Sequence, residues 1–133
     1  MARAIKQSEA SLHQQVVNYL KWQYPNVLFR TDFAAGIKMT IGQAVKHKKL
    51  QKCKAWPDLF IAEKHGNYNG LFIEIKKAKE DIYLKSGAFK NDVHINEQRE
   101  MLEELRKRGY AAFFGCGFES IIVIINEYLK WAA

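Results

Sequence analysis

The sequence predicts one α/β (α+β) domain in which a mixed central β-sheet is flanked by helices. Three observations support this fold class. The chain has 133 residues, which suits a single domain of ordinary size. Apolar residues make up 48% of it, enough for a hydrophobic core. Helix and strand patterns follow one another in the order α-β-β-β-α-β-α over residues 1–133, without a repeat or a linker.

The first expected element is a helix over residues 8–23. Ser8 can cap it, and Glu9 lies in the first turn, where the helix dipole favours an acid. The sequence Tyr24-Pro25-Asn26 ends the helix. Its apolar residues recur at helical spacing: Leu12, Val16, Val17, Tyr19 and Leu20.

Short apolar segments predict the strands of the first half. Residues 27–30 form one strand, and residues 34–55 form a basic loop in which residues 42–51 also fit a helix. Residues 58–63 and 71–77 are two further strands. Because the turn between them is rich in Gly and Asn, we expect these two strands to form a β-hairpin.

The second half begins with residues 78–95, which show no periodicity and are longer than a usual connection. Such segments are often functional or disordered. A helix over residues 96–108 follows, with Asn96 as its cap and Gly109 in the left-handed position after its end. Residues 110–114 complete the sheet as a fourth strand.

The last segment fits two structures. After a turn at residues 115–117, the β-branched run from Ile121 to Ile125 is typical of a strand. The wider spacing over residues 119–131, which adds Tyr128 and Leu129, fits a helix. We predict a helix.

The charge is uneven. The net charge is +7, and residues 37–54 hold lysines but no acid. Such a stretch predicts contact with a polyanion, with a solvated lysine-rich loop as the alternative. The lysines concerned are Lys38, Lys46, Lys48, Lys49, Lys52 and Lys54.

Several protein classes are disfavoured. No apolar run approaches the ~20 residues that span a bilayer, so we expect no membrane partner. Residues 1–6 lack the apolar part of a secretory signal, which makes a cytoplasmic location the default expectation. Cys53 and Cys116 lack the spacing of a zinc site, and we expect two free thiols.

The candidate catalytic residues are Asp58 and the tripeptide Glu74-Ile75-Lys76. Alternate side chains of a strand share a face, so Phe72, Glu74 and Lys76 point the same way. The hairpin can bring Asp58 beside Glu74. This would place two carboxylates and an amine together on one face.

Such a group suits hydrolysis of a phosphodiester. Mg²⁺ or Mn²⁺ could bind the carboxylates of Asp58 and Glu74 and the backbone carbonyl of Ile75. The ion would polarise the phosphoryl group, and Lys76 could orient the attacking water or stabilise developing charge. Without metal, the two carboxylates would resist joint ionisation. The alternative is an ordinary hairpin with one solvent-exposed face, although the apolar neighbours of both acids argue against it.

This Pro-Asp…Glu-x-Lys pattern resembles the signature of the PD-(D/E)XK nucleases, and its setting is similar to that of the VRR-NUC (virus-type replication–repair nuclease) family. The resemblance implies a restriction-endonuclease-like core and a metal-dependent DNA nuclease. Small stand-alone members are similar to Holliday-junction resolvases and act as homodimers, whereas larger members cut branched DNA in repair. The matching segments are residues 8–12, 55–60 and 71–77, Gln98, and Leu105 with Gly109 and Tyr110.

The resemblance implies a role for each matching residue. Asp58 and Glu74 would be metal ligands, and Lys76 the catalytic lysine. Glu9 would be a further acid acting on the metal directly or through water, and Gln98 would reach the site from its helix. For Glu9 the alternative is an acid that favours the helix dipole, and for Gln98 an ordinary surface residue of a helix.

Some positions depart from the family pattern. His13 stands where a Gln commonly follows the first acid, and Lys54-Ala55-Trp56 replaces a segment that usually contains Gly. We expect His13 to be satisfied or solvent-facing rather than a ligand. Lys77 points opposite Lys76 and is structural or faces DNA.

These observations favour a Mg²⁺- or Mn²⁺-dependent, structure-selective endonuclease for branched DNA. One hypothesis is a homodimeric four-way-junction resolvase from a virus or mobile element, with the lysines between Lys38 and Lys54 holding phosphates near the metal. Two alternatives remain open: a restriction- or nicking-type nuclease on duplex DNA, and a non-catalytic DNA-binding module with the same fold.

Overall fold

The computed structural model describes residues 8–32 and 39–130. Within these residues the chain forms a four-stranded sheet in the order β1-β2-β3-β4. The first two strand pairs are antiparallel and the last is parallel. The strands are β1 (Phe29–Thr31), β2 (Leu59–Ile61), β3 (Leu71–Lys76) and β4 (Ala111–Cys116).

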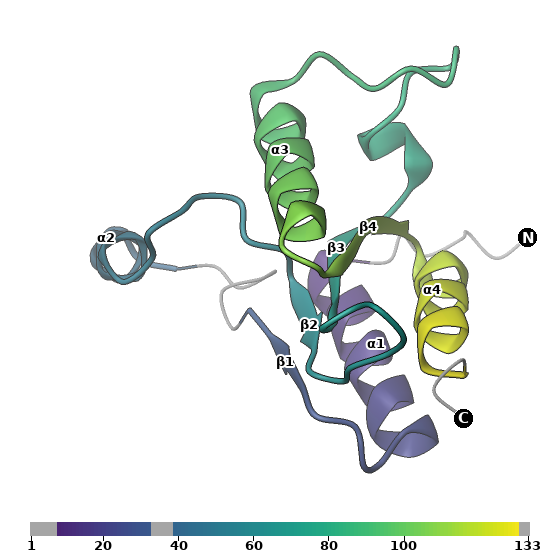
Figure 1. The fold of residues 1–133 in the computed structure, drawn as a ribbon. Coiled ribbons are helices and arrows are strands. Elements are labelled where there is room, and N and C mark those ends of the chain that lie inside the picture. The colour runs from purple at the N-terminus through teal and green to yellow at the C-terminus, as the bar shows by residue number, and fades with distance from the viewer. Residues whose placement is uncertain (1–7, 33–38, 131–133) are drawn as a thin grey trace, which may run out of the picture.

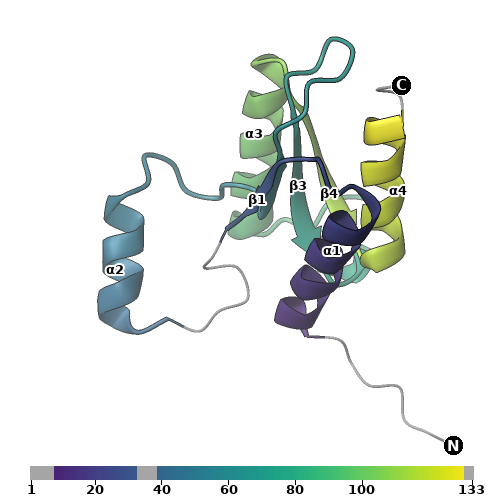
Figure 2. The same cartoon turned by 90° about the horizontal axis from the view of Figure 1, so that it is seen from below.

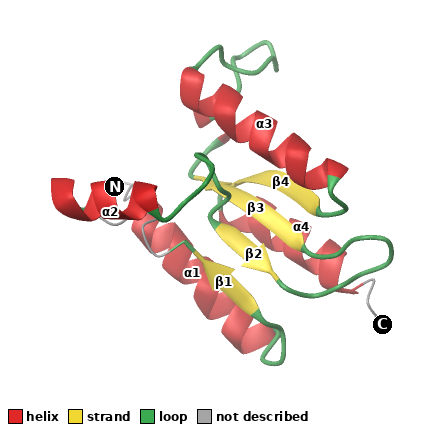
Figure 3. Ribbon diagram, turned by 60° about the vertical axis from the view of Figure 1, so that its left-hand side comes forward, coloured by secondary structure: helices red, strands yellow, loops and turns green. Residues whose placement is uncertain are grey.

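Helices cover both faces of this sheet (Figures 1 and 3). One face carries α1 and α4, and the other carries α3. The mixed sheet and its flanking helices confirm the predicted fold class. The helical elements are α1 (Glu9–Gln23), α2 (Ile41–Lys49), the 3₁₀ turn η1 (Lys79–Asp81), α3 (Val93–Lys107) and α4 (Phe118–Lys130).

The larger part of the core lies between the sheet and the α1/α4 pair. Leu12, Val16 and Leu20 of α1 are fully buried, as the helical spacing predicted. Gly115 lets α4 approach β4, since a Cβ there would lie 2.6 Å from Cγ1 of Ile121. The remaining buried members of this cluster come from the strands and α4: Leu59, Ile61, Leu71, Ile73, Ile75, Ala111, Ile121, Ile125, Tyr128 and Leu129.

The second face of the sheet is only partly apolar. Phe72 packs with Leu102 and Leu105 of α3 and with Ala112 of β4. Ile73 and Ile75 belong to the opposite cluster, so β3 alternates as expected. The next positions on the Phe72 side of β3 are Glu74 and Lys76. The apolar contact with α3 therefore ends where the charged residues begin.

The helix α2 differs from the others, because it buries none of its residues. A capping box formed by Thr40 and Gln43 begins it. Ile41, Val45 and Leu50 are exposed along it or at its end. Figures 1 and 2 show α2 standing apart from the sheet. The expected order lacked this helix, which lies between β1 and β2 where a basic loop was the main prediction.

The beginning of α3 corrects a second expectation. The helix starts at Val93 rather than Asn96, and Asp92 is its cap. The Asp92 carboxylate accepts hydrogen bonds from the backbone N–H groups of His94 and Ile95. The buried Ile95 explains the earlier start, because packing of its side chain adds a turn that the acid-rich segment after Asn96 did not reveal.

Residues 78–92 form an irregular segment. It contains η1, the buried Ile82 and a bridge between Tyr83 and Phe89. Most of its other residues are exposed, which agrees with its lack of periodicity.

Other expected boundaries shift by one or a few residues. Strand β1 starts at Phe29, and β2 is confined to Leu59–Ile61. The predicted turn at residues 115–117 is wrong for its first two members, which pair with Ile75 and Lys76 of β3. Only Gly117, at φ +84°, leaves the strand. The last segment is the helix α4, as predicted.

Two further expectations concern membrane-spanning helices and the cysteines of the described residues. Among the helices of this part of the chain, none is long and apolar enough to cross a membrane. Cys53 and Cys116 are both free thiols, as expected.

Candidate active site

The candidate site lies where β2 begins and β3 ends. Pairing of the two strands stops at Leu59 and Ile73. Beyond this pair, Oδ2 of Asp58 accepts a hydrogen bond of 2.8 Å from the backbone N–H of Ile75. The Asp58 side chain thus connects the two strands beyond their last backbone pair. This hydrogen bond holds Asp58 in a buried position beside Glu74.

Glu74 lies on the α3 side of the sheet and is 5% exposed. Its Oε1 accepts a 3.0 Å hydrogen bond from Nε2 of Gln98, which comes from α3. The same oxygen is 3.9 Å from Nζ of Lys76. The structure therefore brings Asp58, Glu74, Lys76 and Gln98 together. Their catalytic roles remain a proposal.

Burial dominates the electrostatics of the two acids. It raises the pKa of Glu74 to about 10, with the Asp58 carboxylate as the second cause. Burial also raises the pKa of Asp58, while hydrogen bonds from the Ile75 N–H and with Glu74 oppose the rise. The Glu74 carboxyl therefore keeps its proton at neutral pH in the metal-free protein and shares a hydrogen bond with Asp58.

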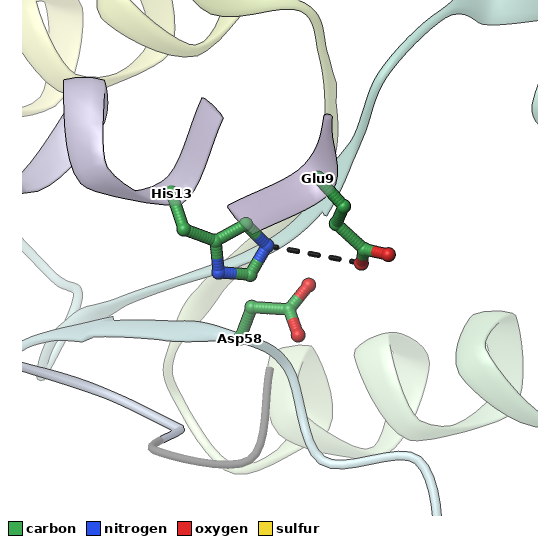
Figure 4. A group of neighbouring side chains, drawn as sticks. All are labelled: Glu9, His13 and Asp58. Atoms are coloured by element: carbon green, nitrogen blue, oxygen red, sulfur yellow. Dashed lines mark ion pairs between the residues drawn. The ribbon is translucent and has the colours of Figure 1, made fainter. Parts of the chain in front are cut away.

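Glu9 and His13 of α1 also lie beside Asp58 (Figure 4). Glu9, His13 and Asp58 each offer a ligand atom, and these atoms lie within 4.8 Å of one another. His13 Nε2 is 3.8 Å from Glu9 Oε1. The Glu9 side chain is half-exposed, whereas His13 is 7% exposed.

The environment of His13 contradicts the expectation of a satisfied or solvent-facing side chain. Its Nε2 is buried without a hydrogen-bond partner. The signal in the sequence was the four-residue spacing from Glu9 together with the neighbouring apolar stripe of α1. That spacing places the ring on the side of the helix that faces the sheet.

The donor set suits a divalent cation. Carboxylates are the ligands that Mg²⁺ and Mn²⁺ prefer, and imidazole nitrogen is a ligand for transition ions. Two buried polar atoms without hydrogen bonds, His13 Nε2 and Gln98 Oε1, lie in this region. The Ile75 carbonyl belongs to the residue whose N–H binds Asp58, so it too lies at this end of β3.

The predicted DNA-binding lysines lie outside this cluster. Lys46, Lys48 and Lys49 are exposed on α2, and Lys52 and Lys54 are exposed in the segment that leads to Asp58. Lys77 is also exposed, next to Lys76. Lys38 lies outside the described residues.

A cavity of about 560 Å³ opens beside Asp58, between α2 and the sheet. Aromatic residues line it, with Phe60 and Phe72 stacked at a centroid distance of 4.5 Å. The Trp56 side chain is 40% exposed. Sequence analysis missed this cavity because Tyr110 and the other rings come from separate strands and segments. Its polar lining residues are Arg30, Thr31, Asp32, His47, Gln51 and Lys52.

Comparison with known proteins supports the fold and the resemblance. No protein-family model and no curated protein matches the chain. A solved structure described as a VRR_NUC domain protein is similar to it, with a TM-score of 0.67 and 25% sequence identity. The match covers 98% of this chain and 93% of that protein. The predicted resemblance to VRR-NUC proteins is thereby confirmed, and it indicates a nuclease-type domain.

Proposed function

We propose that residues 1–133 form a single nuclease domain that hydrolyses phosphodiester bonds of branched DNA with Mg²⁺ or Mn²⁺. The observation that carries this proposal is the buried Asp58–Glu74 pair at the end of β3. Buried carboxyl groups with raised pKa values are costly in an ordinary sheet and are typical of sites that bind a cation.

Asp58 and Glu74 would hold the cation, with the Ile75 carbonyl and Glu9 as further oxygen donors. The ion would supply Lewis-acid polarisation of the phosphate and a more acidic water. Glu74 must release its proton when the cation binds, since a carboxylate is the ligand.

Lys76 and Gln98 would act around these ligands. The Lys76 ammonium lies near Glu74 and would orient the attacking water or stabilise charge that grows on the phosphorane. Gln98 donates to Oε1 of Glu74, which fixes the plane of that carboxylate. Gln98 is therefore a positioning residue in this proposal.

The basic residues would bind the DNA backbone. The exposed lysines of α2 and of the segment that follows it point to contacts with phosphates, which position DNA without reading its sequence. The members of this set that the structure describes are Lys46, Lys48, Lys49, Lys52, Lys54 and Lys77. Lys38 belongs to the set as a prediction from the sequence.

The aromatic cavity supports a branched substrate over plain duplex DNA. Stacking of a base on an aromatic side chain contributes about 1–3 kcal/mol, and it requires a base that is free of its own stack. Trp56 is exposed at the cavity beside Asp58, so a base that loses its stacking neighbour at a branch point would bind there. A continuous duplex offers no such base.

We further propose that the chain acts as a homodimer, because a two-fold pair of sites suits the symmetry of a four-way junction. Sedimentation equilibrium tests this part. A monomer at all micromolar concentrations, with and without junction DNA, would remove it and leave the nuclease proposal intact.

The main test is cleavage of a labelled four-way junction beside a linear duplex of matching sequence. The reactions contain Mg²⁺, Mn²⁺ or EDTA. We expect cleavage of the junction with either metal, none in EDTA, and none by Asp58→Asn. The control variant is Glu127→Gln, which neutralises an exposed acid of α4 and should cleave like the wild type.

Other outcomes select the alternatives. Equal cleavage of junction and duplex would favour a restriction- or nicking-type nuclease. If folded protein binds DNA but cuts neither junctions nor flaps with either metal, the chain is a DNA-binding module instead.

A further inference from the structure

His13 is held in place by the core of the protein. It lies on the second turn of α1, between the fully buried Leu12 and Val16, which fix this helix against the sheet. The ring cannot turn out to solvent without disturbing that packing. Figure 4 shows the edge of the ring turned toward the carboxylates of Glu9 and Asp58.

The nitrogen that faces these carboxylates is unsatisfied. His13 Nε2 is buried and has no hydrogen-bond partner, although the residue is 7% exposed. Its distance of 3.8 Å to Glu9 Oε1 is too long for a hydrogen bond. A buried polar atom left in this state is destabilising, because it has lost its hydrogen bonds to water and gained none in return. Native proteins usually satisfy such an atom with a partner, and here the neighbours are two carboxyl groups.

The spacing of the three groups suits one cation. Two ligands at about 2.1 Å from an ion lie up to ~4.2 Å apart. The ligand atoms of Glu9, His13 and Asp58 all lie within 4.8 Å of one another. A small rotation of the half-exposed Glu9 side chain would close the difference. The unpartnered nitrogen and the two carboxylates therefore surround a single position.

We propose that Nε2 of His13 is a ligand of the cation that binds between Glu9 and Asp58. This inference rests on the proposed metal-dependent function and deepens it, because it assigns a nitrogen donor to the site. Imidazole binds transition ions well, whereas Mg²⁺ prefers oxygen ligands. The site therefore favours Mn²⁺ over Mg²⁺ more strongly than carboxylates alone would.

Mn²⁺ is the probe that tests this ligand directly. Pulsed electron paramagnetic resonance of the Mn²⁺-loaded protein should show coupling to a directly bound ¹⁴N nucleus. The coupling should change to that of ¹⁵N when the wild-type protein is labelled with ¹⁵N-histidine. This measurement needs no substitution and does not depend on cleavage activity.

Variants then assign the nitrogen. We expect His13→Gln to lose the coupling and to bind Mn²⁺ at least about tenfold more weakly, with a smaller change for Mg²⁺. His65→Gln is the matched control, because His65 is equally buried but lies at the opposite end of the β2–β3 hairpin. It should keep both the coupling and the affinity. Circular dichroism establishes that each variant is folded.

Two failures are distinguishable. If wild-type protein binds Mn²⁺ in a manner that Asp58→Asn abolishes, but shows no histidine coupling, the ligand role of His13 is overturned and the metal site stands. The same conclusion follows if the coupling persists in His13→Gln. If wild-type protein binds no Mn²⁺, both this inference and the proposed metal-dependent function are overturned.

Discussion

The end of β3 and the helix α2 carry their charges in opposite ways. At the end of β3, Asp58 and Glu74 are buried and contact each other. Lys76 and Gln98 lie beside Glu74. On α2 the charged groups are exposed and the helix buries no residue. The α2 lysines are Lys46, Lys48 and Lys49.

This difference separates the residues proposed to act in catalysis from the residues proposed to bind DNA. Burial makes the carboxyl groups at β3 respond strongly to each other and to a cation, so one substitution there should change the whole group. Exposed lysines act through a field that salt screens over about 10 Å at 0.1 M ionic strength. Their effects should be smaller, similar to one another and additive.

The largest expected effect compares one lysine from each region. Lys76→Ala should lower the single-turnover cleavage rate of a junction by about 10²–10³-fold, because it removes a cation beside the reacting phosphate. Its DNA affinity in EDTA should change little. Lys48→Ala should cleave at nearly the wild-type rate when DNA is saturating. Equal rate losses in the two variants would contradict the separation.

The next effect is on stability, and its sign follows from the raised pKa of Glu74. The folded metal-free protein holds a proton on Glu74 up to a pKa of about 10, whereas the unfolded chain loses it near the ordinary value of 4.5. The folded state thus binds more protons between these values, so stability falls as pH rises. At roughly 1.4 kcal/mol per pH unit for one proton, we expect a loss of about 4 kcal/mol from pH 5 to pH 8.

Urea unfolding in EDTA at the two pH values measures this loss. Glu74→Gln should remove most of it, since the amide cannot ionise and still accepts a hydrogen bond from Gln98. The exposed Glu127→Gln should retain the wild-type dependence. If the wild-type protein is equally stable at both pH values, Glu74 is not held protonated by its surroundings.

The sequence predicted the β3 region well because its cues are local. Two-residue alternation placed Glu74 and Lys76 on one face, and the hairpin placed Asp58 beside them. The structure bears out this proximity, while the catalytic roles stay predictions. The apolar periodicity of α1 and α4 likewise predicted two helices that pack as expected.

Other features depend on contacts between distant segments. The apolar stripe of α1 indicates the helix face that carries His13, but the approach of His13 to Asp58 joins two segments that are distant in the sequence. The cavity near Asp58 needs rings from β2, β3 and the segments that precede β2 and β4 to converge. The cap at Asp92 was missed because Asn96 offered an equally good local signal, and the packing of Ile95 decided between them.

A smaller effect should come from the lysines of α2. Replacing Lys46, Lys48 and Lys49 together by Ala should weaken junction binding and lower its salt dependence. Each lost phosphate contact lowers the slope of log K against log salt by about 0.9. Fluorescence anisotropy over a range of salt concentrations measures the slope. The matched control replaces Lys21, Lys64 and Lys130, which are exposed elsewhere, and an equal change in that variant would deny α2 a special role.

The smallest expected effect compares the caps of two helices. Asp92 caps α3, which packs on the sheet, and Asp92→Ala should lower the free energy of unfolding by about 1 kcal/mol. Thr40 caps α2 through a hydrogen bond with the Gln43 N–H. Because α2 buries no residue, its fraying is independent of global unfolding. Thr40→Ala should therefore leave urea unfolding unchanged.

The same Thr40 variant should still lose helical signal in circular dichroism and bind junction DNA slightly more weakly, since its lysines are less well ordered. A loss of global stability equal to that of Asp92→Ala would mean that α2 is fixed to the body of the protein. The contrast between a rigid site and a loosely attached basic helix would then fail at α2, while the buried carboxyl pair would be unaffected.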